Sequence, residues 1–171
     1  MPLVSELLDA TLGKGFWELD LGAPGSHMVA VSSGEIIGAA SGTIVDSLEQ
    51  APDLPGPVGL IRLAAVRADS RRMGVAFQLA RAVGGDCLRR GASSLAALAW
   101  VYGGSGACPL AGVLERLGFS RRERLRDFYA GVGIGACPQC GCDSCPCSAD
   151  VYVALSLSEE TGTPLLVEDG G

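Results

Sequence analysis

The chain has 171 residues, of which 48% are apolar and 19% are charged. This composition is typical of one globular domain and is too hydrophobic for a disordered chain. The longest uncharged stretch, residues 91–114, contains Gly103, Gly104 and Gly106, and such a glycine cluster argues against a membrane span. The N-terminal residues lack the basic start of a signal peptide, so we expect a cytoplasmic protein.

The net charge of −6 is distributed unevenly along the chain. Twelve of the thirteen basic residues lie between Arg62 and Arg126, where only four acidic residues occur. A basic centre in an acidic chain favours a local site for a small anion and argues against a long nucleic-acid surface. We therefore expect neither a nucleic acid nor a membrane as partner, and a homodimer is left open.

Apolar periodicity predicts one helix and three strands in the first half of the chain. The expected bounds are 3–12 for the helix and 27–32, 36–45 and 58–66 for the strands. Ser33-Gly34-Glu35 has the composition of a tight turn and joins the first two strands as a hairpin. In the third strand, Ile61, Leu63 and Ala65 are expected to share one face.

The second half is predicted to contain two more helices and three more strands, followed by an acidic tail. The expected bounds are 73–88 and 110–117 for the helices, 94–101, 124–130 and 151–157 for the strands, and 158–171 for the tail. This order predicts a single domain of the α/β (α+β) class over residues 1–157, with a short sheet. A cysteine-rich insert, residues 131–148, falls between the last two strands.

Small and basic residues connect the third strand to the second helix. This connection contains Arg71, Arg72, Gly74 and Ala76. A strand that leads into a helix in this way directs several backbone N–H groups and the positive end of the helix dipole at one point, which favours anion binding. The alternative is an ordinary loop with two solvated arginines.

Three segments resemble motifs of the GCN5-related N-acetyltransferase (GNAT) superfamily. Arg71-x-x-Gly74-x-Ala76 resembles its acetyl-CoA pyrophosphate signature, (Arg/Gln)-x-x-Gly-x-(Gly/Ala). The ending Leu-Glu-Arg-Leu-Gly-Phe at 114–119 is similar to the family's Tyr-Glu-x-Leu-Gly-Phe, and Gly-Glu-Ile-Ile-Gly at 34–38 is similar to its second and third strands. The segments follow the family's order within residues 5–157, and three motifs in register are more specific than one.

The resemblance implies an acyl-CoA N-acyltransferase fold, with a mixed central sheet flanked by helices, and acetyl-CoA as cosubstrate. It places the pyrophosphate on backbone N–H groups of residues 72–76 and the pantetheine arm along the main chain near Val66. The next strand, near residues 98–100, would diverge to admit the thioester. The residues so implied in cofactor binding are Val66, Arg71, Arg72, Met73, Gly74, Val75 and Ala76.

The sequence departs from the family pattern where catalysis needs an acid and a base. Leu114 stands where the family usually has a tyrosine acid, and Ala107 where it often has an asparagine. Tyr102 is our preferred substitute for the acid. Alternative acids are Tyr129 and Cys108.

The third strand carries no carboxylate where many family members have a glutamate base. Glu49 or Asp53, in the proline-rich connection, could act as base through water, whereas His27 is interpreted as structural. The resemblance thus implies an N-acetyltransferase that acts on a small-molecule or protein amine. The alternatives are a non-catalytic binding or regulatory module of the same fold and, less favoured, a metal buffer or redox sensor.

Five of the seven cysteines lie within residues 137–147. Cys137-Pro-Gln-Cys140-Gly has the pattern of a zinc knuckle, and Cys145-Pro-Cys147 supplies a second close pair. We therefore expect Cys137, Cys140, Cys145 and Cys147 to bind zinc, with Cys142 as a spare and iron or an iron–sulfur cluster as the less favoured alternative. A closed four-thiolate site has a structural role by default, and it could also shape a pocket wall or an interaction surface.

Overall fold

The computed structural model describes residues 2–14, 25–130, 136–137 and 139–157. The elements in chain order are α1 (Pro2–Leu12), β1 (Ser26–Ser32), β2 (Glu35–Val45), β3 (Val58–Val66), the 3-10 turn η1 (Ala68–Ser70), α2 (Val75–Arg89), β4 (Ser94–Val101), α3 (Ala111–Arg116), β5 (Ser120–Leu125) and β6 (Ser148–Ala154). Within the described ranges, none of these helices has the length and apolar character needed to cross a membrane.

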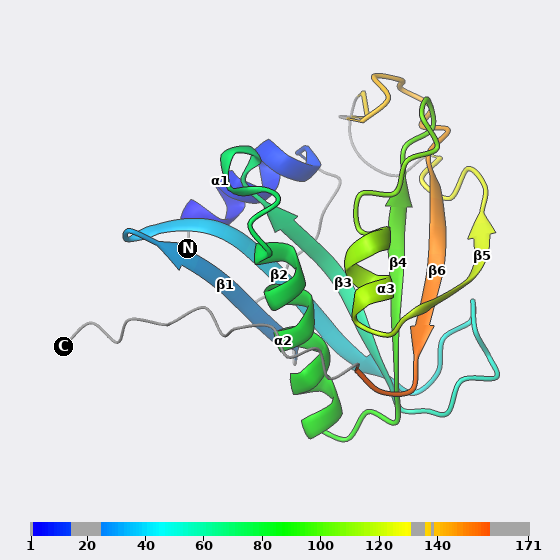
Figure 1. The fold of residues 1–171 in the computed structure, drawn as a ribbon. Coiled ribbons are helices and arrows are strands. Elements are labelled where there is room, and N and C mark those ends of the chain that lie inside the picture. Colours follow the sequence, from blue (N-terminus) through cyan, green and yellow to red (C-terminus); the bar gives the residue numbers. More distant parts are fainter. Residues whose placement is uncertain (1, 15–24, 131–135, 138, 158–171) are drawn as a thin grey trace.

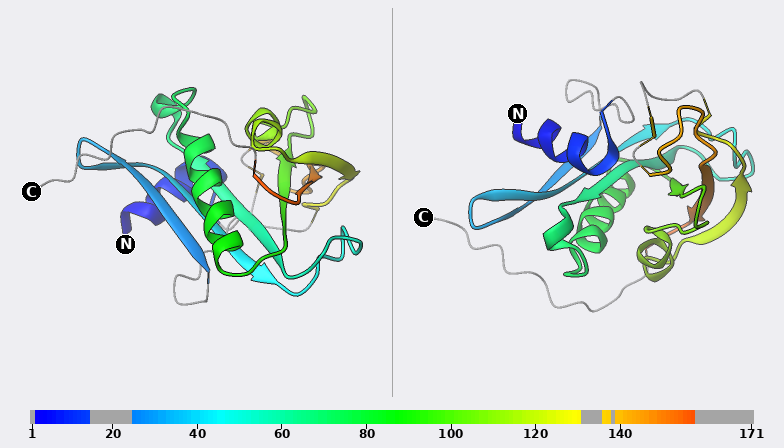
Figure 2. Two further views of the ribbon diagram at one scale, coloured as in Figure 1. Left: turned by 60° about the horizontal axis from the view of Figure 1, so that its bottom comes forward. Right: turned by 90° about the horizontal axis from the view of Figure 1, so that it is seen from above.

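The six strands form one mixed sheet in the order β1-β2-β3-β4-β6-β5. Only β3 and β4 are parallel, and every other neighbouring pair is antiparallel. Helices α2 and α3 cover one face of the sheet and α1 covers the opposite face (Figures 1 and 2). The predicted mixed α/β fold with flanking helices is therefore confirmed, and the tail at 158–171 lies outside the described residues.

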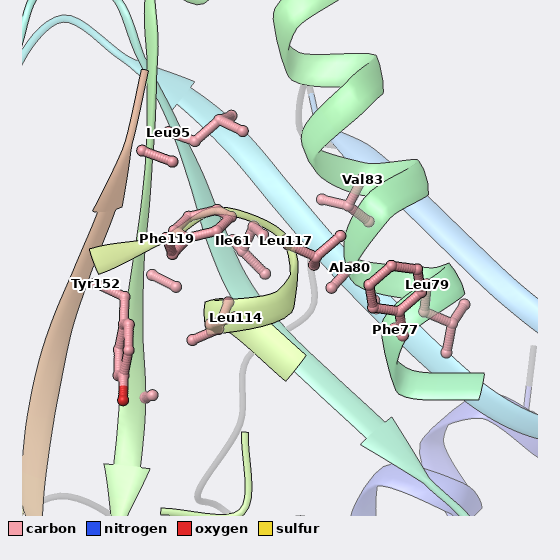
Figure 3. Packing of buried hydrophobic residues seen from close by; sticks show 14 of the residues in the cluster. Ile61, Phe77, Leu79, Ala80, Val83, Leu95, Leu114, Leu117, Phe119 and Tyr152 are labelled. Carbon is pink, nitrogen blue, oxygen red and sulfur yellow. The ribbon is translucent and has the colours of Figure 1, made fainter. Parts of the chain in front are cut away.

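The main core fills the space between the sheet and the helices α2 and α3 (Figure 3). Helix α2 forms because its apolar side chains recur at helical spacing, and Ala80 and Val83 on this stripe are fully buried. Gly42 of β2 allows the helix to approach closely, since a Cβ there would stand 2.6 Å from the Val83 side chain. This packing fixes the position of α2 on the sheet.

The bounds of the first four strands agree closely with the sequence prediction, and those of the last two strands differ from it. The bounds of β3 and β4 are as predicted. The prediction of a strand at 124–130 is wrong, because β5 covers 120–125 and five of its six residues are exposed, so it has no buried apolar face to reveal it. Strand β6 lies three residues earlier than predicted, since its last pair joins Ala154 to Leu95 near the start of β4.

A bulge in β3 changes which side chains share a face. Ser41 of β2 pairs with Leu63 and Gly42 pairs with Ile61, which leaves Arg62 as an extra residue. Ile61 therefore packs in the α2 and α3 core, whereas Leu63 and Ala65 pack with α1. The prediction that these three residues share one face is wrong, because the extra residue interrupts the two-residue alternation of the strand.

Candidate functional site

Strands β3 and β4 separate halfway along their length. Their parallel pairing runs from Val58 with Ser94 to Ile61 with Ala97 and ends there, and Figure 1 shows the two strands diverging beyond this point. A pocket of about 1100 Å³ is lined by the diverging segments, residues 61–66 and 97–100. The divergence predicted near residues 98–100 is thus present in the structure.

The N-terminus of α2 lies at this pocket. The N-cap residue Gly74 has a φ of +80°, and no side chain caps the helix, so the first N–H groups of α2 remain free of a side-chain acceptor. Arg72 also has a positive φ, 65°. A Cβ added at Gly74 would meet nothing within 4 Å, so open space adjoins the backbone there. This geometry can hold a phosphate group against the helix end.

Six of the seven residues that the resemblance implied for cofactor binding line the pocket. They are Val66, Arg71, Arg72, Gly74, Val75 and Ala76. Met73 is not among the lining residues, and this residue is 67% exposed. Arg71 donates from Nε to the carbonyl oxygen of Val66 at 3.2 Å, which ties the loop to the end of β3.

Arg71 and Arg72 are exposed and have no carboxylate partner among the described residues. Arg67, by contrast, pairs with Glu35 and Asp69, with both N–O distances at 2.7 Å. The two arginines at the start of α2 therefore keep their charge available for an anion, while Arg67 is neutralised locally. Together with the positive end of the helix dipole they make this end of the pocket electropositive.

Aromatic side chains form another part of the pocket wall. Tyr102 follows β4 directly in a turn closed by a bond from the N–H of Gly106 to the Tyr102 carbonyl oxygen at 2.7 Å. Tyr129 stacks on Trp100 with ring centroids 4.7 Å apart, and all three side chains line the pocket. Burial raises the pKa of Tyr102, although the charge of Arg71 opposes this rise. Burial raises the pKa of Tyr129 to about 12, so both phenols are protonated at neutral pH.

The other candidate acids and bases lie outside the pocket lining. Glu49 and His27 are exposed, and Asp53 pairs with Arg122 at 2.6 Å. Cys108 is half-buried beside the main core. None of these side chains is among those that line the pocket. Tyr102 and Tyr129 are therefore the candidate acids that the fold brings to it.

The two positions that depart from the family motifs have different surroundings. Leu114 is fully buried in the core between α3 and the sheet, as Figure 3 shows. It does not line the pocket. Ala107 lies exposed in the turn after β4, where its N–H bonds to the Ser105 hydroxyl at 3.2 Å. Neither position supplies a polar side chain to the site.

Four cysteines come together as predicted. The sulfur atoms of Cys137, Cys140, Cys145 and Cys147 all lie within 4.8 Å of one another, with Cys137 and Cys147 at 4.0 Å and Cys140 and Cys145 at 3.9 Å. The turn between the first two is closed by the N–H of Gly141 on the Cys137 carbonyl oxygen at 2.8 Å. The fifth sulfur, of Cys142, is exposed and is not part of this group of four.

The cysteine group adjoins the pocket. Its buried members pack against Trp100 and Tyr129, and the N–H of Gly103 donates to the sulfur of Cys147 at 3.3 Å. Gln139, within the knuckle, lines the pocket and donates to the Thr11 carbonyl oxygen of α1 at 3.5 Å. The insert therefore forms part of the pocket wall. The sequence alone did not indicate that Gln139 and Arg62 line the pocket. The position of Gln139 depends on a long-range contact with Thr11, and that of Arg62 depends on the bulge in β3.

The sheet opens between its parallel strands and a helix N-terminus lies at the opening, as the resemblance to acyl-CoA N-acyltransferases implied. The chain belongs to the acetyltransferase (GNAT) family, whose model matches residues 4–119. No curated protein sequence matches the chain.

Solved structures with the same fold come from several bacteria. The ribosomal-protein-S18-alanine N-acetyltransferase of Escherichia coli is 18% identical, with a TM-score of 0.54 over 82% of this chain and 76% of that one. A putative acetyltransferase of Salmonella typhimurium, solved with its cofactor acetyl-CoA, is 14% identical, with a TM-score of 0.53 over 83% and 70%. The ribosomal-protein-alanine N-acetyltransferase of Brucella melitensis is 16% identical, with a TM-score of 0.53 over 77% and 68%. At these identities the likeness is one of fold.

Proposed function

We propose that the protein is an acetyl-CoA-dependent N-acetyltransferase. The observation that carries this proposal is the pocket between the diverging ends of β3 and β4, which opens onto the uncapped N-terminus of α2. The free N–H groups at Gly74, Val75 and Ala76, with the charges of Arg71 and Arg72, would hold the pyrophosphate. The β3 main chain up to Val66 would bind the pantetheine arm.

Acetyl-CoA, when bound, supplies an acetyl group activated as a thioester. Transfer to an amine forms a C–N bond and breaks the C–S bond. The acceptor ammonium group gives up two protons in total, one to solvent and one to the departing sulfur. The protein must therefore keep the acceptor unprotonated at the moment of attack and supply a proton to the sulfur.

Tyr102 is the residue that we assign to the second task. It lies at the end of β4 where that strand faces the pocket, and its raised pKa keeps the hydroxyl protonated at neutral pH. Tyr129 stacks on Trp100 and packs against the cysteines, which holds its ring in the wall. We assign the first proton to solvent, because the described lining contains no carboxylate and Glu49 and Asp53 lie outside it.

We further propose that Cys137, Cys140, Cys145 and Cys147 bind one structural zinc ion. A tetrahedral site with Zn–S bonds of about 2.3 Å places its sulfur atoms about 3.8 Å apart. The distances of 4.0 Å and 3.9 Å between paired sulfurs fit this requirement. Four thiolates leave no open position for water, so the ion would hold the insert against Trp100 and Tyr129. A reducing compartment such as the cytoplasm would keep these thiols available.

Calorimetric titration with CoA, followed by acetylation of an amine panel, tests the proposal. Saturable binding with turnover is expected. Binding without turnover on any amine would instead favour the non-catalytic module, which the burial of Leu114 at the family's tyrosine position makes a definite second candidate. Absence of CoA binding at millimolar concentration would contradict both.

A further inference from the structure

The charged side chains that line the pocket all have one sign. Among the described residues, the lining contains Arg62, Arg71, Arg72 and Arg116 and no aspartate, glutamate, histidine or lysine. The whole chain carries a net charge of −6, so the charge of the pocket lining is opposite in sign to that of the chain as a whole. A cationic cavity attracts anionic groups and disfavours a bound ammonium ion.

Three of these arginines lie on the side of the pocket where the cofactor is proposed to bind. Arg71 and Arg72 precede the N-terminus of α2, and the Arg116 guanidinium lies over the ring of Phe77 in α2, 4.6 Å from its centroid. Arg62 differs from them, because it is the extra residue of the β3 bulge and stands where β3 and β4 separate.

Arg62 is too far from the α2 N-terminus to share its phosphate. Three residues of extended strand lie between Arg62 and Val66, so their Cα atoms are four residue steps, or about 13 Å, apart. The next residue, Leu63, packs in the α1 cluster with Leu12, and Leu12 lines the pocket too. Arg62 is exposed, and among the described residues no ion pair joins it to a carboxylate. Its charge is therefore open to a second anionic group at the other end of the pocket.

We propose that the acceptor is an α-amine that carries a nearby carboxylate, and that Arg62 binds this carboxylate. The proposal rests on the proposed function, since it concerns the second substrate of the same site. A guanidinium group presents paired donors that match a carboxylate, which fixes the orientation of the substrate as well as adding affinity.

The lack of a carboxylate in the described lining favours an α-amine over a lysine side chain. With no acidic residue to remove its proton, the acceptor must arrive unprotonated. Peptide α-amines have pKa values of about 7.7–8.0 and lysine side chains about 10.4, so the unprotonated fraction near neutral pH is several hundred-fold larger for the α-amine. The surrounding arginines would also lower the pKa of a bound amine and so favour its neutral form.

Matched acceptors test the charge preference directly. We would measure kcat/KM with acetyl-CoA for Asp-Ala amide and Asn-Ala amide, which differ only in the side-chain carboxylate. A second pair, alanine and alaninamide, tests the carboxylate of a free amino acid. Because that carboxylate raises the pKa of the neighbouring α-amine, the rates of this pair are compared per unprotonated amine. Nα-acetyl-lysine amide tests the ε-amine. We expect at least a tenfold preference for the anionic member of one pair. The pair that shows this preference identifies whether the substrate is a peptide or a free amino acid. The lysine compound should have the lowest rate.

Variants show whether Arg62 is responsible. Arg62→Gln should reduce the preference within the favoured pair to about twofold or less, and Arg62→Lys should retain part of it, because the positive charge remains. Arg126→Gln, an exposed arginine outside the pocket lining, is the matched control and should keep the full preference. A merely structural role would lower both members of the pair equally.

The outcomes separate this inference from the proposed function. If CoA binds but no amine is acetylated, we would measure the affinity of the two dipeptide amides for the CoA-saturated protein in place of turnover. The same preference for the anionic amide is expected. Equal rates or affinities within both pairs, or a preference that survives in Arg62→Gln, would overturn the inference while leaving acetyl transfer intact. Failure to bind CoA would overturn both.

Discussion

The hydroxyl of Tyr102 is the single group on which the proposed proton transfer depends. Tyr102→Phe should lower kcat by about 100-fold or more, which is the usual contribution of a general acid, and should leave CoA affinity unchanged. Because burial raises the pKa of Tyr102 above its ordinary value, the wild-type rate should not fall on the alkaline side below about pH 10. Steady-state kinetics across pH measure both effects.

Tyr129 provides the comparison for that experiment. Its ring also lines the pocket, but it stacks on Trp100 and packs against the cysteines. Tyr129→Phe keeps the ring and should change kcat far less than Tyr102→Phe. The reverse order of effects would reassign the acid to Tyr129, and no effect of either change would point to solvent as the proton donor.

Asp150 shows how a buried charge is accommodated in this sheet. It is 1% exposed, and Arg124 donates to both of its carboxylate oxygens, at 2.7 Å and 2.8 Å. Arg124 lies on β5 and Asp150 on β6, directly paired in the register. This ion pair attaches the exposed edge strand β5 to β6 at a specific residue, which the sequence pattern of β5 did not indicate.

Asp150→Asn should destabilise the fold by about 2–3 kcal/mol, because a buried charged hydrogen-bonded pair loses one partner. The hydrogen bonds from Arg124 lower the pKa of Asp150 from 3.8, so this stabilisation is present above pH 4 and is lost as the pH falls through the lowered pKa. Chemical denaturation at pH 7 and at pH 3 measures the difference. An equal free energy of unfolding for the two proteins at pH 7 would contradict this account of the pair.

At the scale of the elements, the buried strands and the amphipathic helices could be predicted closely from the sequence. Strands β3 and β4 are apolar on both faces and bounded by turn residues, and α2 has a clear helical stripe. The edge strand β5 could not be predicted, because only Leu125 among its residues is even partly buried. The bulge at Arg62 could not be predicted either, because it depends on pairing with β2, some twenty residues earlier.

The candidate site, like the fold, could be predicted from the sequence only where it depends on local patterns. The loop predicted to bind an anion and the four cysteines follow local spacing rules, and the structure brings each set together. The distribution of charge inside the pocket was not visible, because it depends on which arginines the fold turns inward and which, like Arg67, it pairs with carboxylates.

The cysteine insert makes the sharpest prediction at this scale. The purified protein should contain one zinc ion per chain, which Cys140→Ser should release and Cys142→Ser should retain, because only the first belongs to the group of four. Metal analysis after reducing, chelator-free purification measures this. A metal-free wild-type protein would contradict the zinc assignment, and metal loss in the Cys142 variant alone would show that the set of four is a different one.

Metal loss should also affect the pocket. Because the cysteines pack on Trp100 and Tyr129, their release would loosen the wall and leave the α2 N-terminus intact. The Cys140→Ser variant should therefore show a raised KM for the amine with little change in CoA affinity. An equal loss in both would indicate that the insert supports the whole fold.

At the scale of the whole molecule, one opening in the sheet organises the proposed chemistry. The bulge at Arg62 and the divergence of β3 from β4 occur at the same point, so the strand geometry that creates the pocket also places a cation in it. The N-terminus of α2 closes one end, and the cysteine insert with α1 forms the other. The pocket therefore has two ends, one for each of the two proposed substrates.

The most direct test of this account is calorimetric titration of the reduced protein with CoA, compared with the double variant Arg71→Gln, Arg72→Gln. Wild type should bind one CoA per chain, and the variant at least tenfold more weakly, because two charges at the proposed phosphate site are lost. The matched control is Arg89→Gln, Arg90→Gln at the far end of α2, which should bind as wild type does. No heat of binding from folded wild-type protein at millimolar CoA, or equal affinity in all three proteins, would contradict the account.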